Sequence, residues 1–545
     1  MQGICERIME EVMIMSDRMR PVPFADMLRE CITEYKDSGT FYGVPVDRSH
    51  GNVPIGPAAG PHTQLAGNIV AAYAAGANSM ELKTVQQLTG KDLDIKKPCI
   101  YTGNEVFNIE WSTELSVPEA LAEYIKAYLL IQVLSKEFGF EDAGQLRFIM
   151  SVGYDLKGIQ SETVDQYINF MKHASTSEEW KRDINCLMEH SDLLEQVTKE
   201  DLAQISDVIS DTVTLSTMHG CKSTEIEKIA VYLIREKQLH TYVKMNPTLI
   251  GKENLERIRL EKGYDDLVFD EESFTQDIDL SMALEIILHA EQTARENGKI
   301  FGVKMTNTLP VRIQKNELEG TQMYMSGPPL YAISILAAAL LAEQTQGRIP
   351  ISYSGGADMH NIRDILETGI APVTVSSLLL KRGGYKNLTQ LLKKAEGTKQ
   401  KGICPEAVKA LAKQALEDVR YNKKEHVVYA KAEQYDCFCA KCTGCVDVCP
   451  NRANIRISVD GKSYVIHRDR LCNECGNCAY FCIQGYVPYL RKFTLFEMEE
   501  DFLESQADGV LYTHTAKRYR KNGEIGDLPM EIEQIIRTGF EKGKL

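Results

Sequence analysis

The chain is 545 residues long, 43% of them apolar, and it carries a formal net charge of −15. The length and apolar content predict two or more domains with a sizeable core. Because an acidic chain repels phosphate backbones, we expect no nucleic-acid partner.

The sequence also argues against export and membrane insertion. The first twenty residues contain four acidic side chains and lack the basic flank and unbroken apolar run of a signal peptide. The longest apolar stretch, YAISILAAALLA (331–342), is too short to span a bilayer and contains Ser334. We therefore expect a cytoplasmic protein with no membrane association.

After a predicted helical extension over residues 1–50, short β-rich runs alternate with amphipathic helices up to about residue 400. Such repeats predict a parallel sheet, and eight or nine of them predict an α/β fold of the (β/α)8 TIM-barrel type. There are nine candidate strands, one more than the barrel needs, and DLVFD (266–270) is expected to be the extra one. The polar stretch 155–211 is expected to form a helical insertion. The nine candidate strands are 53–60, 79–85, 147–154, 212–218, 242–247, 266–270, 300–308, 349–356 and 371–377.

The carboxyl ends of these strands predict an FMN site, because barrel active sites lie there. Small residues after the first strand would let a flat ring approach the backbone, and glycines and serines after the last two are typical of a phosphate site. A lysine near the flavin would stabilise the reduced, anionic ring. Each feature alone is typical of an ordinary turn or a solvated lysine, but their order along the barrel favours a flavin. The cofactor-binding candidates are Ala58, Ala59, Gly60, Lys83, Thr84, Lys244, Lys304, Gly327, Gly355, Gly356, Ser376 and Ser377.

No GxGxxG follows a predicted strand, so a Rossmann-type NAD(P)H or FAD site is not expected. Electrons are instead expected to enter through metal clusters.

Nine of the fifteen cysteines lie between residues 437 and 482, which predicts metal ligands in a reducing compartment. Two successive runs have the C-x2-C-x2-C-x3-C spacing of a two-cluster ferredoxin, in which the fourth cysteine of each run binds the other cluster. Paired zinc sites are the alternative, but zinc knuckles normally use two CxxC pairs. We assign one 4Fe–4S cluster to Cys439, Cys442, Cys445 and Cys482, and the second to Cys472, Cys475, Cys478 and Cys449.

Cys437 falls outside this pattern and is expected to be a spare thiol. The alternating stretch 453–470, around Asp460–Gly461, predicts a β-hairpin. We expect a linker helix over 401–430, a small α+β bacterial-type ferredoxin domain over 431–490, and a C-terminal extension over 491–545.

At the level of whole motifs, the order PAAG…ELKTV…FNIE…MSVGY…TLSTMHG…VKMTNT…SGGA…VSS resembles the FMN barrel of dihydroorotate and dihydropyrimidine dehydrogenases. A closer resemblance, over residues 19–400, is to the YgfK family. The stretches that carry it are MRPVPFADML (19–28), GPAAGPHTQLAGNIV (56–70), ELKTVQ (81–86), FNIEWSTE (107–114), MSVGYDLKGI (150–159), TLSTMHGC (214–221), VKMNPTL (243–249), MYMSG (323–327) and ISYSGGA (351–357).

The resemblance implies an iron–sulfur flavoprotein that reduces a heterocyclic oxo-base, with urate as the best candidate, in anaerobic purine degradation. Longer family members carry a flavin and NAD(P)H-type module further along the chain. The resemblance therefore implies a partner subunit or a soluble ferredoxin as electron donor, and relatives form homo- or hetero-oligomers. A pyrimidine reductase and an electron-transfer subunit are the alternatives.

The resemblance also implies roles for side chains near the base, namely substrate binding by Asn108, Glu110, Thr214, Asn307 and Thr308. The pyrimidine enzymes have NLSCPHG where this chain has TLSTMHG, so their proton-donating cysteine is replaced. This departure argues for a different base, such as a larger purine. Because VKMNP and VKMTNT both match the family's lysine strand, the choice between Lys244 and Lys304 at the flavin stays open. The remaining candidates for the proton donor are Thr217, through a bound water, His219 and Cys221.

Overall fold

The computed structural model describes residues 19–545 apart from 89, 91, 94, 104, 110, 111, 141–145, 219, 400, 426–428 and 514. Two predicted site residues, Glu110 and His219, lie outside the described residues. Eight parallel strands in the order β3-β14-β13-β10-β9-β8-β7-β4 form the central sheet. The strands are β3 (Ile55–Pro57), β4 (Ser79–Glu81), β7 (Arg147–Gly153), β8 (Thr212–Ser216), β9 (His240–Met245), β10 (Phe301–Met305), β13 (Ile351–Tyr353) and β14 (Val373–Val375).

The sheet closes into a barrel between its two edge strands. Beside β4, the amide of Asn78 donates a hydrogen bond to the carbonyl of Ile55 in β3, with an N–O distance of 2.9 Å. Each of the eight strands overlaps a predicted run, which confirms the (β/α)8 barrel. The surplus run, DLVFD, contributes only an isolated bridge between Phe269 and Val311, as expected.

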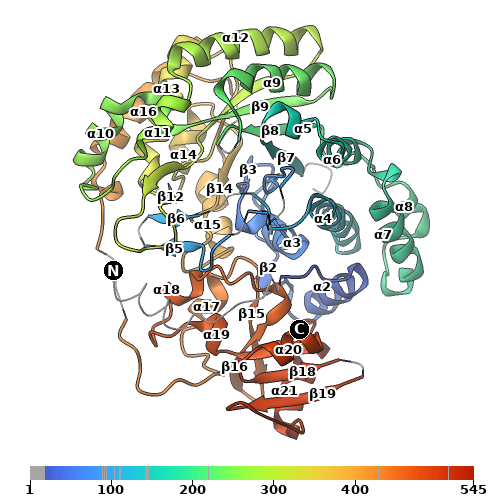
Figure 1. The fold of residues 1–545 in the computed structure, drawn as a ribbon. Coiled ribbons are helices and arrows are strands. Elements are labelled where there is room, and N and C mark those ends of the chain that lie inside the picture. The colour runs from blue at the N-terminus through green and yellow to red at the C-terminus, as the bar shows by residue number, and fades with distance from the viewer. Residues whose placement is uncertain are drawn as a thin grey trace.

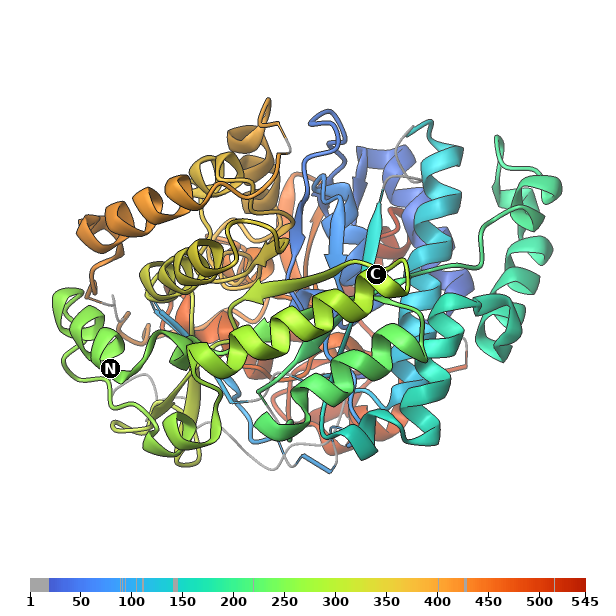
Figure 2. The same ribbon diagram turned by 90° about the horizontal axis from the view of Figure 1, so that it is seen from above.

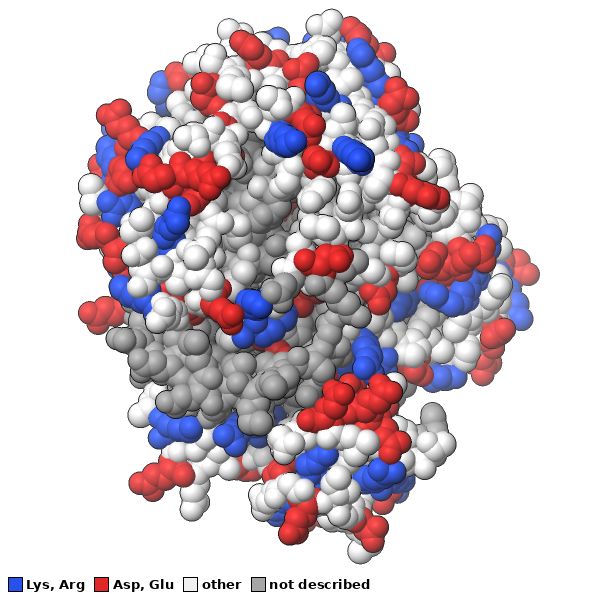
Figure 3. All heavy atoms as spheres, in the orientation of Figure 1, with Lys and Arg blue, Asp and Glu red and all other residues white. Residues whose placement is uncertain are grey.

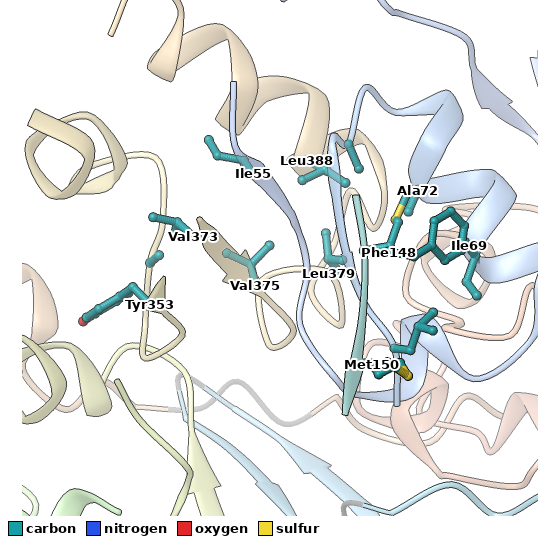
Figure 4. Packing of buried hydrophobic residues seen from close by; sticks show 14 of the residues in the cluster. Ile55, Ile69, Ala72, Phe148, Met150, Tyr353, Val373, Val375, Leu379 and Leu388 are labelled. Carbon is teal, nitrogen blue, oxygen red and sulfur yellow. The ribbon is translucent and has the colours of Figure 1, made fainter. Parts of the chain in front are cut away.

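Helices surround the strands in Figures 1 and 2. Figure 4 shows buried side chains from β3, β14 and the following helix, including Ile55, Val375 and Leu388, gathered into the core between these elements. No helix in the described part of the chain is long and apolar enough to cross a membrane. Between β3 and residue 395, the helices outside the insertion are α3 (Ala66–Ala74), α4 (Val117–Glu137), α9 (Ile226–Arg235), α10 (Lys252–Glu261), α11 (Glu271–Gln276), α12 (Leu280–Glu296), α13 (Leu330–Gln344), α14 (Ile362–Glu367) and α15 (Lys386–Ala395).

Between β7 and β8 the chain forms four further helices, which lie outside the barrel at the right of Figure 1. They correspond to the polar insertion predicted over 155–211. These helices are α5 (Leu156–Ile159), α6 (Glu162–Lys172), α7 (Glu178–Glu189) and α8 (Lys199–Ala203).

A four-stranded antiparallel sheet, absent from the sequence prediction, extends from the loops after β4 and β10. Its order is β11-β12-β6-β5, and its strands are β5 (Ile100–Thr102), β6 (Val106–Asn108), β11 (Leu309–Arg312) and β12 (Gln322–Ser326). Because both loops leave the carboxyl ends of barrel strands, this sheet lies at the end of the barrel where active sites occur.

The cysteine-rich segment lies along the lower edge of the barrel in Figure 1. Its hairpin, β15 (Asn454–Val459) and β16 (Lys462–Arg468), confirms the predicted turn at Asp460–Gly461. Each cysteine run contains a short helix, α17 (Gly444–Asp447) in the first and α18 (Asn477–Tyr480) in the second, and α19 (Pro488–Arg491) follows the second run.

The hairpin belongs to a larger sheet than expected. Its order is β15-β16-β17-β18-β19-β20, so the expected ferredoxin domain and C-terminal extension share one sheet across residue 490. The added elements are β17 (Phe493–Phe496), α20 (Glu499–Glu504), β18 (Gly509–Tyr512), β19 (Lys517–Lys521), β20 (Glu524–Gly526) and α21 (Met530–Glu541).

Two flanking segments pack on the barrel. Helix α16 (Pro405–Glu417), in the expected linker, lies against α13. Helix α2 (Phe24–Ser38) is followed by a small hairpin, β1 (Thr40–Phe41) and β2 (Val44–Pro45). On the face shown in Figure 3, acidic and basic side chains of the described residues are interspersed.

Candidate active site and cysteine centre

A cavity with about 660 Å³ of empty space, part of it open to solvent, lies at the carboxyl ends of the barrel strands. Its lining comes from segments that follow almost every strand and from the end of β12. The lining residues are Ala58, Ala59, Thr84, Ser216, Met218, Lys244, Thr306, Asn307, Thr308, Ser326, Gly327, Leu330, Ser354, Gly355, Gly356, Ala357, Thr374, Val375, Ser376 and Ser377.

Most of the predicted cofactor residues meet in this lining. Gly60, Lys83 and Lys304 do not line it, and the other nine do. Of the described substrate candidates, Asn307 and Thr308 line the cavity, whereas Asn108 and Thr214 are buried outside its lining.

Sequence reasoning missed nine lining residues. Several are neighbours of predicted ones, as Thr306 is of Asn307 and Ser354 is of Gly355, so strand-end position could have found them. Ser326 ends strand β12 of the antiparallel sheet, and the MYMSG motif was its signal in the sequence; Leu330, at the start of α13, had none. The full set is Ser216, Met218, Thr306, Ser326, Leu330, Ser354, Ala357, Thr374 and Val375.

The two glycines after β13 form a cradle that only glycine fits. Gly356 has φ +74°, and a Cβ there would lie 2.7 Å from the carbonyl oxygen of Gly327. A Cβ on Gly355 would lie 2.2 Å from Ser334 Oγ. The carbonyls of both glycines are already engaged, by Tyr353 Oη at 2.8 Å and by Asn361 Nδ2 at 3.0 Å respectively.

Directly under the cavity lies a buried ion pair. Lys304 Nζ is 3.3 Å from Glu81 Oε2, and the two side chains are 2% and 0% exposed. The same carboxylate oxygen accepts hydrogen bonds from the amide of Ala59 at 3.0 Å and from Thr374 Oγ1 at 3.1 Å. Both donors line the cavity, so the pair supports its floor.

The charges of this pair follow from their surroundings. Burial opposes ionisation of Glu81, but Lys304 and, more weakly, Lys244 lower the pKa of the carboxyl below its usual value. Burial lowers the pKa of Lys304 to about 8, although Glu81 raises it. We therefore treat both groups as charged at neutral pH. Lys244, unlike Lys304, reaches the cavity itself.

A chain of side-chain amides fixes Asn307 at the cavity wall. Asp277 accepts a hydrogen bond from Asn246 Nδ2 at 2.7 Å and another from Thr248 Oγ1 at 2.5 Å. Asn246 Oδ1 in turn accepts from Asn307 Nδ2 at 2.7 Å. Because its amide nitrogen is engaged, Asn307 presents its Oδ1 as the acceptor available to a ligand.

The described proton-donor candidates border a smaller neighbouring pocket with about 310 Å³ of empty space, part of it open solvent, and Asp277 also lines this pocket. Thr217 Oγ1 donates to the carbonyl of Lys244 at 2.7 Å. Burial, with a smaller contribution from Glu225, raises the pKa of Cys221 to about 12. Cys221 is therefore protonated at neutral pH, whereas the hydroxyl proton of Thr217 is held by the backbone.

The predicted cluster ligands form two sets of thiols, which we name the inner set and the outer set. The inner set is Cys449, Cys472, Cys475 and Cys478, and the outer set is Cys439, Cys442, Cys445 and Cys482. Burial is the main cause that raises the pKa of Cys472, Cys475 and Cys478, and the Cys449 thiol adds to it at all three. Burial likewise raises the pKa of Cys445 to about 12, with Cys482, Cys442 and Cys449 adding to it.

This arrangement brings the fourth cysteine of the first run beside the second run, and Cys482 beside the first. Two of the candidate ligand sulfurs accept backbone hydrogen bonds: Cys449 Sγ from Ala453 N and Cys472 Sγ from Glu474 N, both at 3.3 Å. No three described His, Cys, Asp or Glu side chains are grouped as they would be around one metal ion. All eight candidate donors are cysteine thiols, the donor type that 4Fe–4S clusters take.

The inner set lies against the barrel. The amide of Ile100 in β5 donates to the carbonyl of Cys475 at 2.9 Å. Thr102 Oγ1 donates to Asn477 Oδ1 at 2.6 Å, and Asn477 Nδ2 donates to the carbonyl of Leu380 at 2.9 Å. The second cysteine run is therefore fastened to the loops that follow β4 and β14.

Comparison with known proteins places the chain by its barrel. Residues 34–423 match the family model described as "Oxidoreductase YgfK, N-terminal TIM-barrel domain". The chain belongs to the YgfK family. It is 39% identical over 467 residues to "Putative oxidoreductase YgfK" of Escherichia coli K12, and equally to that of E. coli O157:H7. The alignments cover 79% of this chain and 45% of each relative, so this YgfK-family chain spans less than half of its curated relatives' length.

Among solved structures, the fold is similar to a ligand-free type dihydroorotate dehydrogenase (DHODH) from Eimeria tenella. The sequences are 14% identical, and the superposition, with a TM-score of 0.39, covers 68% of this chain and 93% of the other.

Proposed function

We propose that this chain is an oxidoreductase that binds FMN in the barrel cavity and two 4Fe–4S clusters at the inner and outer thiol sets. We further propose that it reduces a heterocyclic oxo-base, with an oxopurine such as urate as the best candidate. The observation that carries the proposal is the attachment of a two-set cysteine centre to the loops of a glycine-cradled barrel cavity.

The cavity residues fit FMN in several respects. The small side chains of Ala58 and Ala59 leave room for a flat ring, and Gly355 and Gly356 line the same cavity. We assign the phosphate to the amides of this segment and to the hydroxyls of Ser376 and Ser377. When bound, FMN supplies hydride transfer and exchanges electrons singly with the clusters.

Lys244 is our candidate for the cation at the flavin, because it lines the cavity while Lys304 is bound to Glu81 below it. For the substrate, Asn307 Oδ1 offers an acceptor for a ring N–H, and Thr308 offers a hydroxyl on the same wall. A lactam ring presents alternating N–H and C=O groups, and a site that pairs with them discriminates strongly against rings that lack them. Cys221 is the described candidate for delivering a proton, across the neighbouring cavity.

The contacts of the inner set suggest the order in which electrons travel. Ser326, in the cavity lining, donates through Oγ to the carbonyl of Val106 at 3.0 Å, and Val106 packs in one cluster with Cys475 and Leu380. We propose that the inner set serves the flavin and that an electron donor docks nearer the outer set. That donor is a soluble ferredoxin or a protein module that binds NAD(P)H and FAD.

The test is anaerobic purification followed by measurement of flavin, iron and sulfide. The dithionite-reduced protein is then mixed separately with urate, xanthine, uracil and selenate, and re-oxidation is followed by absorbance. Rapid re-oxidation by urate supports the oxopurine assignment, whereas re-oxidation by uracil alone moves the protein to the pyrimidine reductases. Clusters without stoichiometric flavin would refute the FMN site and favour an electron-transfer subunit.

A further inference from the structure

Among the described residues, each thiol set has a lysine close to it that is not part of its cysteine runs. For the inner set this is Lys97, in the segment before β5. Gly476, in the second cysteine run, has φ +84°, and a Cβ there would lie 2.4 Å from Cβ of Pro98. The cysteine loop therefore packs directly on the side chain of Pro98, the residue that follows Lys97.

Lys97 is held at this contact by an ion pair that also reaches the cysteine loop. Its Nζ lies 2.6 Å from Glu114 Oε2, and the side chains are 20% and 12% exposed. Glu114 Oε1 accepts from Asn473 Nδ2 at 2.7 Å, and Asn473 adjoins Cys472. The cation and the carboxylate are therefore both fixed, rather than free in solvent.

Lys492 occupies the corresponding place at the outer set. It is a buried side chain between α19 and β17, and its Nζ donates to the carbonyl of Cys439. The same ammonium lies 5.6 Å from the centroid of the Tyr435 ring. No carboxylate pairs with Lys492 in the part of the chain that the structure describes.

A fixed cation affects a cluster's reduction potential in a known direction. Reduction adds one electron and hence one negative charge to the cluster, while no bond forms or breaks and the lysine keeps its proton. A nearby positive charge stabilises the reduced form, so it raises the potential, and a carboxylate lowers it. Burial matters because water screens exposed charges.

We propose that Lys97 and Lys492 separately set the reduction potentials of the two clusters, Lys97 that of the inner set and Lys492 that of the outer set. This inference rests on the proposed function, because it needs the clusters to bind. It goes beyond the assignment of ligands, because each cluster has its own nearby lysine that raises its reduction potential. Glu114 has the opposite effect and lowers the potential of the inner cluster.

The experiment is an anaerobic redox titration of the full chain, followed by electron paramagnetic resonance, on wild type, K97Q, K492Q and E114Q. We expect K97Q to lower the midpoint potential of one cluster. The equilibrium constant for reduction of that cluster should fall about tenfold, which corresponds to ~59 mV for one electron. K492Q should lower the midpoint of the other cluster, and E114Q should raise the one that K97Q lowers. K462Q is the control, because Lys462 is exposed on the hairpin and its loss changes only the net charge.

The outcomes separate this inference from the proposed function. Fewer than two clusters in the wild-type protein, measured as iron and sulfide per chain, would refute the cluster assignment itself. Two intact clusters with unchanged midpoints in K97Q and K492Q would overturn the inference alone, as would both variants shifting the same midpoint. Opposite shifts in K97Q and E114Q could not come from loosened packing, since that would act in one direction. Equal iron content in all variants is the check that each one folds.

Discussion

Replacing Lys304 with methionine tests whether the ion pair under the cavity is charged. Methionine keeps the length and apolar stem of lysine but leaves Glu81 as an isolated buried carboxylate. At 3.3 Å and an effective dielectric constant of about 20, the attraction between the two charges is about 5 kcal/mol. Removing one partner of such a buried pair typically costs about 3–5 kcal/mol of stability. Lys244, the other cation that stabilises Glu81, would offset part of this loss.

The loss is measured by urea denaturation of K304M and wild type, followed by circular dichroism, with equal m-values as the condition for comparison. E81Q and the double variant E81Q/K304M complete a double-mutant cycle. We expect the double variant to be more stable than K304M, because it removes the unpaired charge. A loss of unfolding free energy below about 1 kcal/mol in K304M would refute the reasoning, because breaking an ionised pair at this depth costs more than that.

Three further predictions concern the cradle, the thiols and a buried acid. G356A should purify with at least tenfold less FMN, because its Cβ would meet the Gly327 carbonyl, whereas G39A, with φ +65° and open space around it, should keep its flavin. C449S should lower the iron content from about eight to about four per chain and remove the same electron paramagnetic resonance signal as C472S; loss of a different signal would refute the interleaved thiol sets. Burial raises the pKa of Glu34 from 4.5 to about 6, so wild type should lose stability relative to E34Q as the pH rises through 6. That loss should reach about 2 kcal/mol at pH 7 by urea denaturation, and parallel pH curves for the two proteins would contradict it.

The sequence by itself determined the barrel and most of the cavity wall. Strand runs such as 147–154 and 212–218 are marked by local patterning, and parallel strands must present their carboxyl ends at one face. Residues at those ends, such as Gly356 and Ser377, were therefore found without coordinates. The C-x2-C-x2-C spacing is local too, since three thiols on one tight loop are fixed by the loop itself.

Only the tertiary structure decided how distant segments meet. Lys244 and Lys304 are paired in register on neighbouring strands, yet one lines the cavity and the other is ion-paired with Glu81, a difference that the strand pattern alone does not reveal. The antiparallel sheet joins loops about two hundred residues apart, and its strands of three to five residues are too short to give a clear periodic signal.

The lysine beside each thiol set belongs to the same class of information. The contact of Gly476 with Pro98 joins residues far apart in the chain, and no spacing rule relates them. Local patterns follow from backbone geometry over a few residues, and the sequence reveals them directly. Which charge lies beside which buried group follows from packing, and packing is a property of the whole fold.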